Sequence, residues 1–189
     1  MKRTMGLLVV LVFGVLPTLA DVKPPEVPYE NKDYNGKFTF VRIRFDPQVW
    51  GMGPYAWGLD LKWNHDYPYA EENLMKILQE LTTIDPSMGA GNILEADDPD
   101  LFDYPLAYIC EVGFWNPDES ESRALREYLL KGGFLIVDDF SDMRAEGRAL
   151  RNFERQLAKV LPDARLIELE SSHAIFQGFF RVDDLDFTH

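Results

Sequence analysis

Short segments that are β-branched, aromatic or continuously apolar recur along the chain, which is typical of strands. They cover residues 38–45, 92–96, 106–110 and 134–137, and residues 165–169 repeat the pattern near the C-terminus. The segment 134–137 is apolar at every position. A strand of that kind is expected to be covered on both faces.

Between the predicted strands, apolar residues recur at the spacing of amphipathic helices. The three stripes are Ala70, Leu74, Ile77, Leu78 and Leu81; Ala124, Leu125, Tyr128 and Leu129; and Leu150, Phe153, Leu157, Val160 and Leu161. Asp66 and Pro68 are expected to begin the first helix, and Asn116 is expected to cap the second. Strands that alternate with helices predict an α/β fold, a three-layer, mainly parallel sheet with helices on both faces.

The N-terminal residues 1–20 have the pattern of a secretory signal peptide. Lys2 and Arg3 precede an apolar run at 6–16, and small residues lead to a cleavage site after Ala20. The run is shorter than the roughly 20 residues that cross a bilayer. We therefore expect an exported protein, periplasmic or secreted, with no transmembrane anchor after cleavage. Residues 21–37 are rich in proline and charge and predict an extended leader, and 38–189 predict a single domain.

The chain is acidic, with a net charge of −13. Loss of residues 1–20 removes two basic residues and no acidic one, so 17 basic and 32 acidic residues remain, a net charge of −15. A field of that sign repels nucleic acid and favours cations and basic partners. Cys110 is the only cysteine, so no internal disulfide can form.

Polar residues follow the predicted strands, where the sheet of an α/β fold binds its ligands. The candidate site consists of His65, Asp66, Glu111, Asp138, Asp139 and His173. The two histidines lack a metal-binding spacing, so the sequence predicts no metal site and identifies no cofactor. Each candidate also has a purely structural interpretation. Asp138 and Asp139 can form hydrogen bonds to loop amides. Asp66 can cap the first helix, and His173 can lie exposed in a loop.

Cys110 is a candidate nucleophile because it ends a predicted strand. No Gly-x-Cys-x-Gly turn surrounds it, and the neighbouring charge of Glu111 opposes formation of the thiolate. A buried, unreactive thiol is the favoured interpretation.

The loop at 46–66 is long and rich in glycine and tryptophan, with Trp50, Trp57 and Trp63. Loops of this length are often functional. The tryptophans can form a stacking platform or a contact surface for a partner, or they can cover the core.

Several motifs together resemble a bacterial family known as domain of unknown function 4159. They are Phe40-Val41-Arg42, Trp63-Asn64-His65-Asp66-Tyr67-Pro68 with Ala70 and Asn73, Leu101-Phe102-Asp103-Tyr104-Pro105, Leu125-Arg126-Glu127-Tyr128-Leu129, Gly132-Gly133-Phe134-Leu135-Ile136-Val137-Asp138-Asp139, and His173-Ala174-Ile175-Phe176 followed by Phe179-Phe180. The resemblance implies a flavodoxin-like sheet related to class I glutamine amidotransferases. It also implies that a C-terminal strand is missing, because the family continues past the end of this chain. The amidotransferase cysteine would follow 134–137, where this chain has Asp138 and Asp139, so that triad is not carried over.

Three functions remain open. The first is a non-catalytic module of the bacterial cell envelope that binds a small polar ligand or a protein. The second is a hydrolase, with or without a metal, built from Asp138, Asp139, His65 and His173. The third is a structural subunit that makes contact through its tryptophan-rich loop. Whether the protein is an enzyme is left open.

Overall fold

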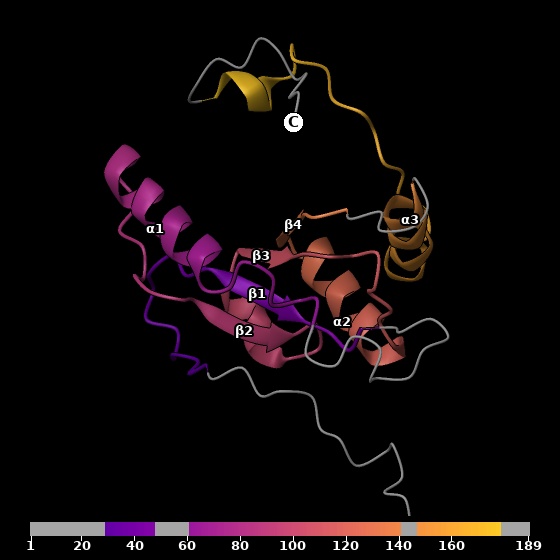
Figure 1. Cartoon of the computed structure of the whole chain (residues 1–189), viewed down its shortest axis with the longest axis horizontal. Coiled ribbons are helices and arrows are strands. Elements are labelled where there is room, and N and C mark those ends of the chain that lie inside the picture. Colours follow the sequence, from indigo (N-terminus) through magenta and orange to yellow (C-terminus); the bar gives the residue numbers. More distant parts are fainter. Residues whose placement is uncertain (1–28, 48–60, 141–146, 179–189) are drawn as a thin grey trace, which may run out of the picture.

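The computed structural model describes residues 29–47, 61–140 and 147–178. Within them strands and helices alternate in the order β1 (Val41–Arg44), α1 (Tyr69–Leu81), β2 (Asn92–Glu95), β3 (Leu106–Ile109), α2 (Glu119–Leu130), β4 (Phe134–Val137) and α3 (Arg148–Val160), with short 3-10 helices η2 (Pro99–Asp103) and η3 (Ala174–Gln177). All pairs of neighbouring strands are parallel, in the order β2-β1-β3-β4 (Figure 1). The predicted α/β fold is confirmed, and the strand order is that of a flavodoxin-like sheet.

The two faces of the sheet carry different kinds of side chain, because neighbouring residues of a strand point in opposite directions. Val41 and Ile43 of β1 belong to the apolar core that includes residues of α2 and α3. Arg42, between them, points to the opposite face and pairs with Glu71 of α1. In Figure 1, α2 and α3 lie together, apart from α1. The sheet is therefore covered by an apolar layer on one face and by a helix with a buried ion pair on the other.

Both predicted helix caps are wrong. The side chain of Asp118, not Asn116, caps α2 and accepts a hydrogen bond from the amide of Glu121, whose carboxylate accepts one from the amide of Asp118. This reciprocal pair satisfies two helix-end amides at once. Asp66 does not cap α1 with its side chain, since only its main-chain carbonyl takes part, accepting from the amide of Ala70.

The predicted apolar stripe of α1 does not coincide with the face that the helix buries. Ile77 is 51% exposed and Leu81 is 45% exposed, whereas the buried residues are Glu71 and Met75. The ion pair between Glu71 and Arg42 explains the rotation, because a charged group can be buried only with its partner.

The prediction that 134–137 is covered on both faces is also wrong. β4 ends the sheet within the described residues, and Phe134 is 57% exposed. The side chains of Leu135 and Val137 pack on the core. Phe134, which is paired in register with Leu106 of β3, points to the other face of the sheet. The face of β4 that carries Phe134 is therefore only partly covered by described residues.

The predicted strand at 165–169 is absent, because this segment pairs with no strand in the described part of the chain. Its side chains are exposed, and Ile167 reaches 79%. Alternation of apolar residues indicates a preference for the extended conformation, but a strand also needs a partner edge.

Several predictions fall outside the described residues: the signal peptide at 1–20, the first part of the leader (residues 21–28), and the loop tryptophans Trp50 and Trp57. Trp63, the third tryptophan of that loop, is buried in the core. None of the helices in the described ranges has the length and apolar character needed to cross a membrane.

Candidate functional site

Three of the predicted site residues meet at the carboxyl edge of the sheet. We call His65, Glu111 and Asp139 the edge cluster. His65 Nδ1 lies 2.9 Å from Glu111 Oε1 and 3.9 Å from Asp139 Oδ2. One nitrogen or oxygen atom from each residue lies within 4.8 Å of the other two. The cluster therefore brings one imidazole and two carboxylates to a single point.

The topology of the sheet explains why residues so far apart in sequence converge. Glu111 follows β3, Asp139 follows β4, and His65 lies in the connection from β1 to α1. Parallel strands end at the same edge of the sheet. From β1 the chain first adds β2 on one side and then β3 and β4 on the other, so the strand order reverses between β1 and β3. Ligands of such folds bind at this switch point.

The backbone at this edge is strained. Among the described residues, four that are not glycine have positive φ angles: Lys62 at 62°, Asp66 at 59°, Glu111 at 50° and Asp139 at 53°. All four lie in the loops that form the edge cluster or adjoin it. Left-handed backbone at a non-glycine residue costs about 1–2 kcal/mol, and strain of this kind concentrates at functional sites.

A buried arginine holds the loop that carries His65. Arg42 donates from Nη1 to the carbonyl of Trp63 at 2.9 Å and to Cys110 Sγ at 3.1 Å. Its Nε donates to Glu71 Oε1 at 2.5 Å, and both side chains of this ion pair are fully buried. Sequence reasoning missed this network, although a charged residue between Val41 and Ile43 in an apolar strand was a usable signal.

Lys62 was also missed. It is 3% exposed, and its Nζ lies 4.6 Å from the centre of the Phe114 ring. A lysine ammonium over an aromatic face is a favourable contact. It ties the loop before His65 to the loop after Glu111.

Cys110 is buried beneath the edge cluster, as the favoured interpretation of the sequence has it. Burial raises the pKa of its thiol to about 11, the charges of Asp139 and Glu111 act in the same direction, and Arg42 only partly opposes them. The Sγ also lies 3.3 Å from the Trp63 carbonyl, to which the thiol donates. The thiol is therefore protonated at neutral pH and plays a structural part.

We expect Cys110 to react with a disulfide reagent at least about 100-fold more slowly in the folded chain than in urea at pH 8, because the unfolded thiol has a pKa near 8.5 and the thiolate is the nucleophile. The folded-state rate should keep rising with pH until about 11. Spectroscopic release of the reagent's thiol measures both rates, with Cys110→Ala as the blank. A folded-state rate that levels off near pH 8.5 would contradict the assignment.

The other predicted residues lie elsewhere. Asp138 accepts from the Tyr108 hydroxyl at 3.2 Å and from the Asp139 amide at 2.8 Å, so the two adjacent aspartates point in different directions. The side chain of His173 caps η3 by accepting from the Ile175 amide, and it is exposed. Asp66 is exposed at the start of α1. Of the set of Asp138, Asp139, His65 and His173, the contacts between side chains of the described residues thus join only His65 and Asp139.

Imidazole nitrogen and carboxylate oxygen are ligands of divalent transition metals. Three such groups leave further coordination positions for a bound molecule. The edge cluster has the composition and spacing to hold a cation in this way, a property that no spacing of histidines along the sequence could indicate.

A comparison with protein families agrees with the motifs quoted above. The model of a family described as domain of unknown function (DUF4159) matches residues 39–188. No curated protein gives a significant match. Since the match spans most of its length, the chain belongs to the DUF4159 family.

Proposed function

We propose that this chain is an exported, non-catalytic module of the bacterial cell envelope that binds a small polar ligand through a divalent cation held by the edge cluster. The observation that carries the proposal is the convergence of His65, Glu111 and Asp139 from three separate connections. The signal-peptide pattern of residues 1–20 supports the location.

The spacing of the donor atoms supports a cation rather than a hydrogen-bonded triad alone. His65 Nδ1 faces both carboxylates, and the Asp139 oxygen lies 3.9 Å from it, beyond hydrogen-bond distance. Two carboxylates beside each other repel unless a positive charge lies between them. A cation among the three atoms supplies that charge.

The donor set favours a transition metal over calcium. Ca²⁺ takes 6–8 oxygen ligands, whereas an imidazole suits Zn²⁺ and similar ions. Glu111 is 3% exposed and Asp139 is 41% exposed at its side chain, so one ligand is deep and another borders solvent. A ligand with a carboxylate or hydroxyl oxygen can complete the coordination from the solvent side.

A binding role agrees with the groups that flank the cluster. Kinship to class I glutamine amidotransferases is part of the proposal, and there the nucleophile follows the strand equivalent to β4. Here Asp138 and Asp139 occupy that position, and Cys110 is buried with a raised pKa. The fold thus offers a ligand site at the usual edge with no thiolate to attack the ligand.

We expect the purified chain to bind one Zn²⁺ in isothermal titration calorimetry. His65→Ala, Glu111→Gln and Asp139→Asn should each weaken binding about 100-fold or more, because loss of even an outer-shell partner costs 10–100-fold. Asp138→Asn is the matched control, since it removes the adjacent carboxylate that points toward Tyr108 instead.

Two results would overturn the proposal. Absence of saturable Zn²⁺ binding, or an equal loss in Asp138→Asn, would remove the cation site. Hydrolysis of ester, amide or glycoside substrates that disappears in Asp139→Asn would show that the module is catalytic.

A further inference from the structure

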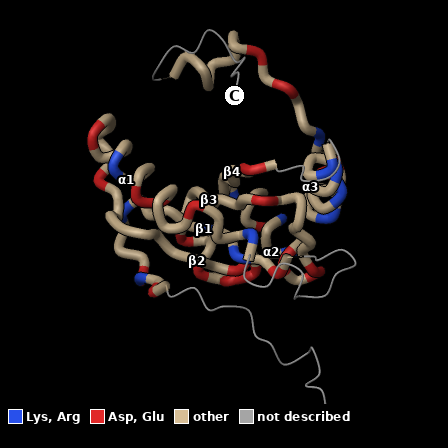
Figure 2. Tube along the Cα trace, in the orientation of Figure 1, with Lys and Arg blue, Asp and Glu red and all other residues tan. Residues whose placement is uncertain are grey.

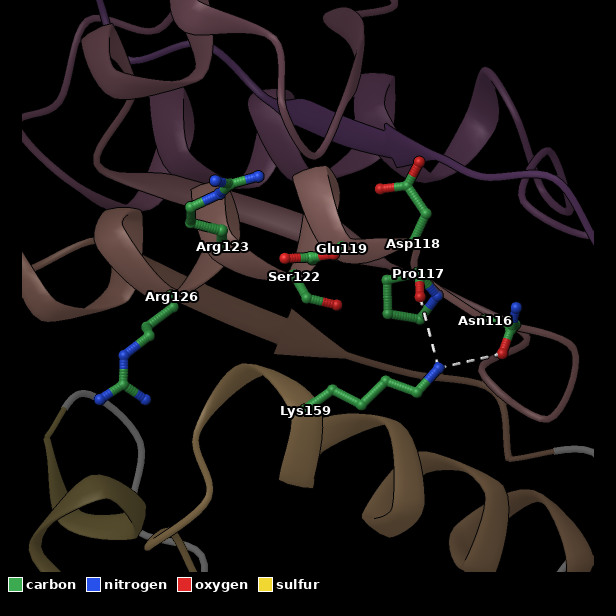
Figure 3. Close-up of a pocket in the computed structure, with 8 residues that line it drawn as sticks. All are labelled: Asn116, Pro117, Asp118, Glu119, Ser122, Arg123, Arg126 and Lys159. Atoms are coloured by element: carbon green, nitrogen blue, oxygen red, sulfur yellow. Dashed lines mark hydrogen bonds between the residues drawn. The ribbon is translucent and has the colours of Figure 1, made fainter.

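We infer that a second site, the groove between α2 and α3, binds the phosphate group of a phosphate ester. The groove has a volume of about 580 Å³, within the range of small-molecule sites. Its lining comes from α2, α3 and the segment before α2, and it shares no residue with the edge cluster (Figure 3). It is thus independent of the proposed cation site.

A buried hydroxyl provides the first ligand contact. Ser122 is 7% exposed, and its Oγ has no hydrogen-bond partner among the residues that the structure describes. Buried polar atoms without partners are costly and rare in folded proteins. Figure 3 shows the Ser122 side chain directed into the groove on the side of Lys159 and away from Arg126. An acceptor oxygen in the groove would satisfy this hydroxyl.

Two cations of the groove lining have donors to spare. Lys159 Nζ donates to Asn116 Oδ1 at 3.2 Å and to the Pro117 carbonyl at 3.4 Å, which uses two of its three hydrogens. Arg126 donates from Nη1 to the Val160 carbonyl at 3.1 Å, one of the five N–H groups of a guanidinium. These main-chain and side-chain contacts position both cations at the rim while leaving N–H groups for a ligand.

The acidic residues of the groove cancel only part of this charge. Arg123, Arg126 and Lys159 are opposed by Asp118 and Glu119. The Asp118 carboxylate accepts from the Glu121 amide as the cap of α2, and in Figure 3 it points away from Lys159.

The surface beside the groove is also basic. Arg148, Arg151, Arg155 and Lys159 recur along α3 at the spacing of one helix face. Figure 2 shows this concentration of basic residues on α3 within a chain whose net charge is −13. The basic face of α3 thus borders the groove on one side, whereas acidic residues continue beyond Asp118 on the other.

The arrangement of the donors favours phosphate over carboxylate. A hydroxyl, an ammonium and a guanidinium line different parts of the groove. A tetrahedral phosphate offers several oxygens in different directions to such donors, whereas a carboxylate has two in one plane. The groove is larger than an inorganic anion. The remaining space suits the organic part of an ester.

Calorimetric titration with glycerol 3-phosphate tests the site. We expect saturable binding to the full chain, weakened about tenfold or more in Lys159→Gln and about three- to tenfold in Ser122→Ala. Ser122→Ala should have an unchanged or higher Tm without ligand, because it removes a buried hydroxyl that lacks a partner. The loss of affinity in this variant would then not come from unfolding.

Lys131→Gln is the matched control, because it removes the same charge from the end of α2 outside the groove, where Lys131 pairs with Glu127. A second arm measures sedimentation with phosphatidylglycerol vesicles. Sedimentation that Lys159→Gln abolishes assigns the phosphate to a lipid headgroup, and binding of glycerol 3-phosphate alone assigns it to a soluble ester. Binding in neither arm, or an equal loss in Lys131→Gln, would overturn the inference.

Discussion

Glu71→Met is expected to lower the free energy of unfolding by about 3–5 kcal/mol, because it leaves the guanidinium of Arg42 buried without its counter-ion. Both side chains are fully buried, and the Arg42 Nε to Glu71 Oε1 distance is 2.5 Å. Urea unfolding followed by tryptophan fluorescence measures the change. The variant should also bind Zn²⁺ less tightly, since the same guanidinium holds the Trp63 carbonyl two residues before His65.

The double variant Arg42→Met, Glu71→Met separates loss of the charge pair from loss of packing. Replacing a whole buried ion pair by apolar residues of similar volume is often neutral or stabilising. We therefore expect the double variant to recover most of the stability that Glu71→Met loses. A double variant less stable than either single variant would show that the two residues act independently and that the ion pair does not determine how α1 packs.

Asn152→Leu is expected to destabilise the chain by about 2–4 kcal/mol. The buried Asn152 amide of α3 donates to the carbonyls of Val112 at 2.7 Å and Trp115 at 2.8 Å. Leucine has a similar branched shape but no donor, so each of the two buried carbonyls would lose a hydrogen bond. The Val112 carbonyl keeps the one from the Trp115 amide, whereas an unsatisfied buried acceptor costs about 1–3 kcal/mol. Because these carbonyls belong to the loop that follows Glu111, the edge cluster should also become less ordered.

The same substitution at Asn73 is the control, since Asn73 lies on α1 and is exposed. Surface substitutions of this kind usually change stability by no more than about 0.5 kcal/mol. Chemical denaturation of both variants gives the comparison. If Asn73→Leu and Asn152→Leu destabilise the chain equally, the two carbonyl contacts do not anchor the loop.

The main elements of the fold were predictable because each depends on local sequence. Continuous or alternating apolar residues mark β1 to β4, and their alternation with helices is sufficient for a parallel sheet. The predicted faces of α1 and β4 failed for a shared reason. Which side of an element is buried depends on distant partners, such as Arg42 for Glu71, and periodicity within one segment carries no information about them.

The candidate site was predictable in part. The rule that ligands bind at the carboxyl ends of parallel strands selected His65, Glu111 and Asp139 correctly as neighbours, but it selected Asp138 and His173 as well. The sequence could not separate these groups, because the direction of each side chain depends on the left-handed turns at Glu111 and Asp139. A left-handed turn at a residue other than glycine cannot be recognised from the sequence and is seen only in the folded chain.

The central claim is that the edge cluster binds a divalent cation, and anomalous X-ray scattering at the zinc absorption edge tests it most directly. Crystals of the chain grown with Zn²⁺ are expected to show an anomalous peak within about 2.0–2.2 Å of His65 Nδ1 and of oxygens of Glu111 and Asp139. The peak should be absent from crystals of Asp139→Asn and present in those of Asp138→Asn. A peak coordinated by other residues, or none at the edge cluster at saturating Zn²⁺, would contradict the claim.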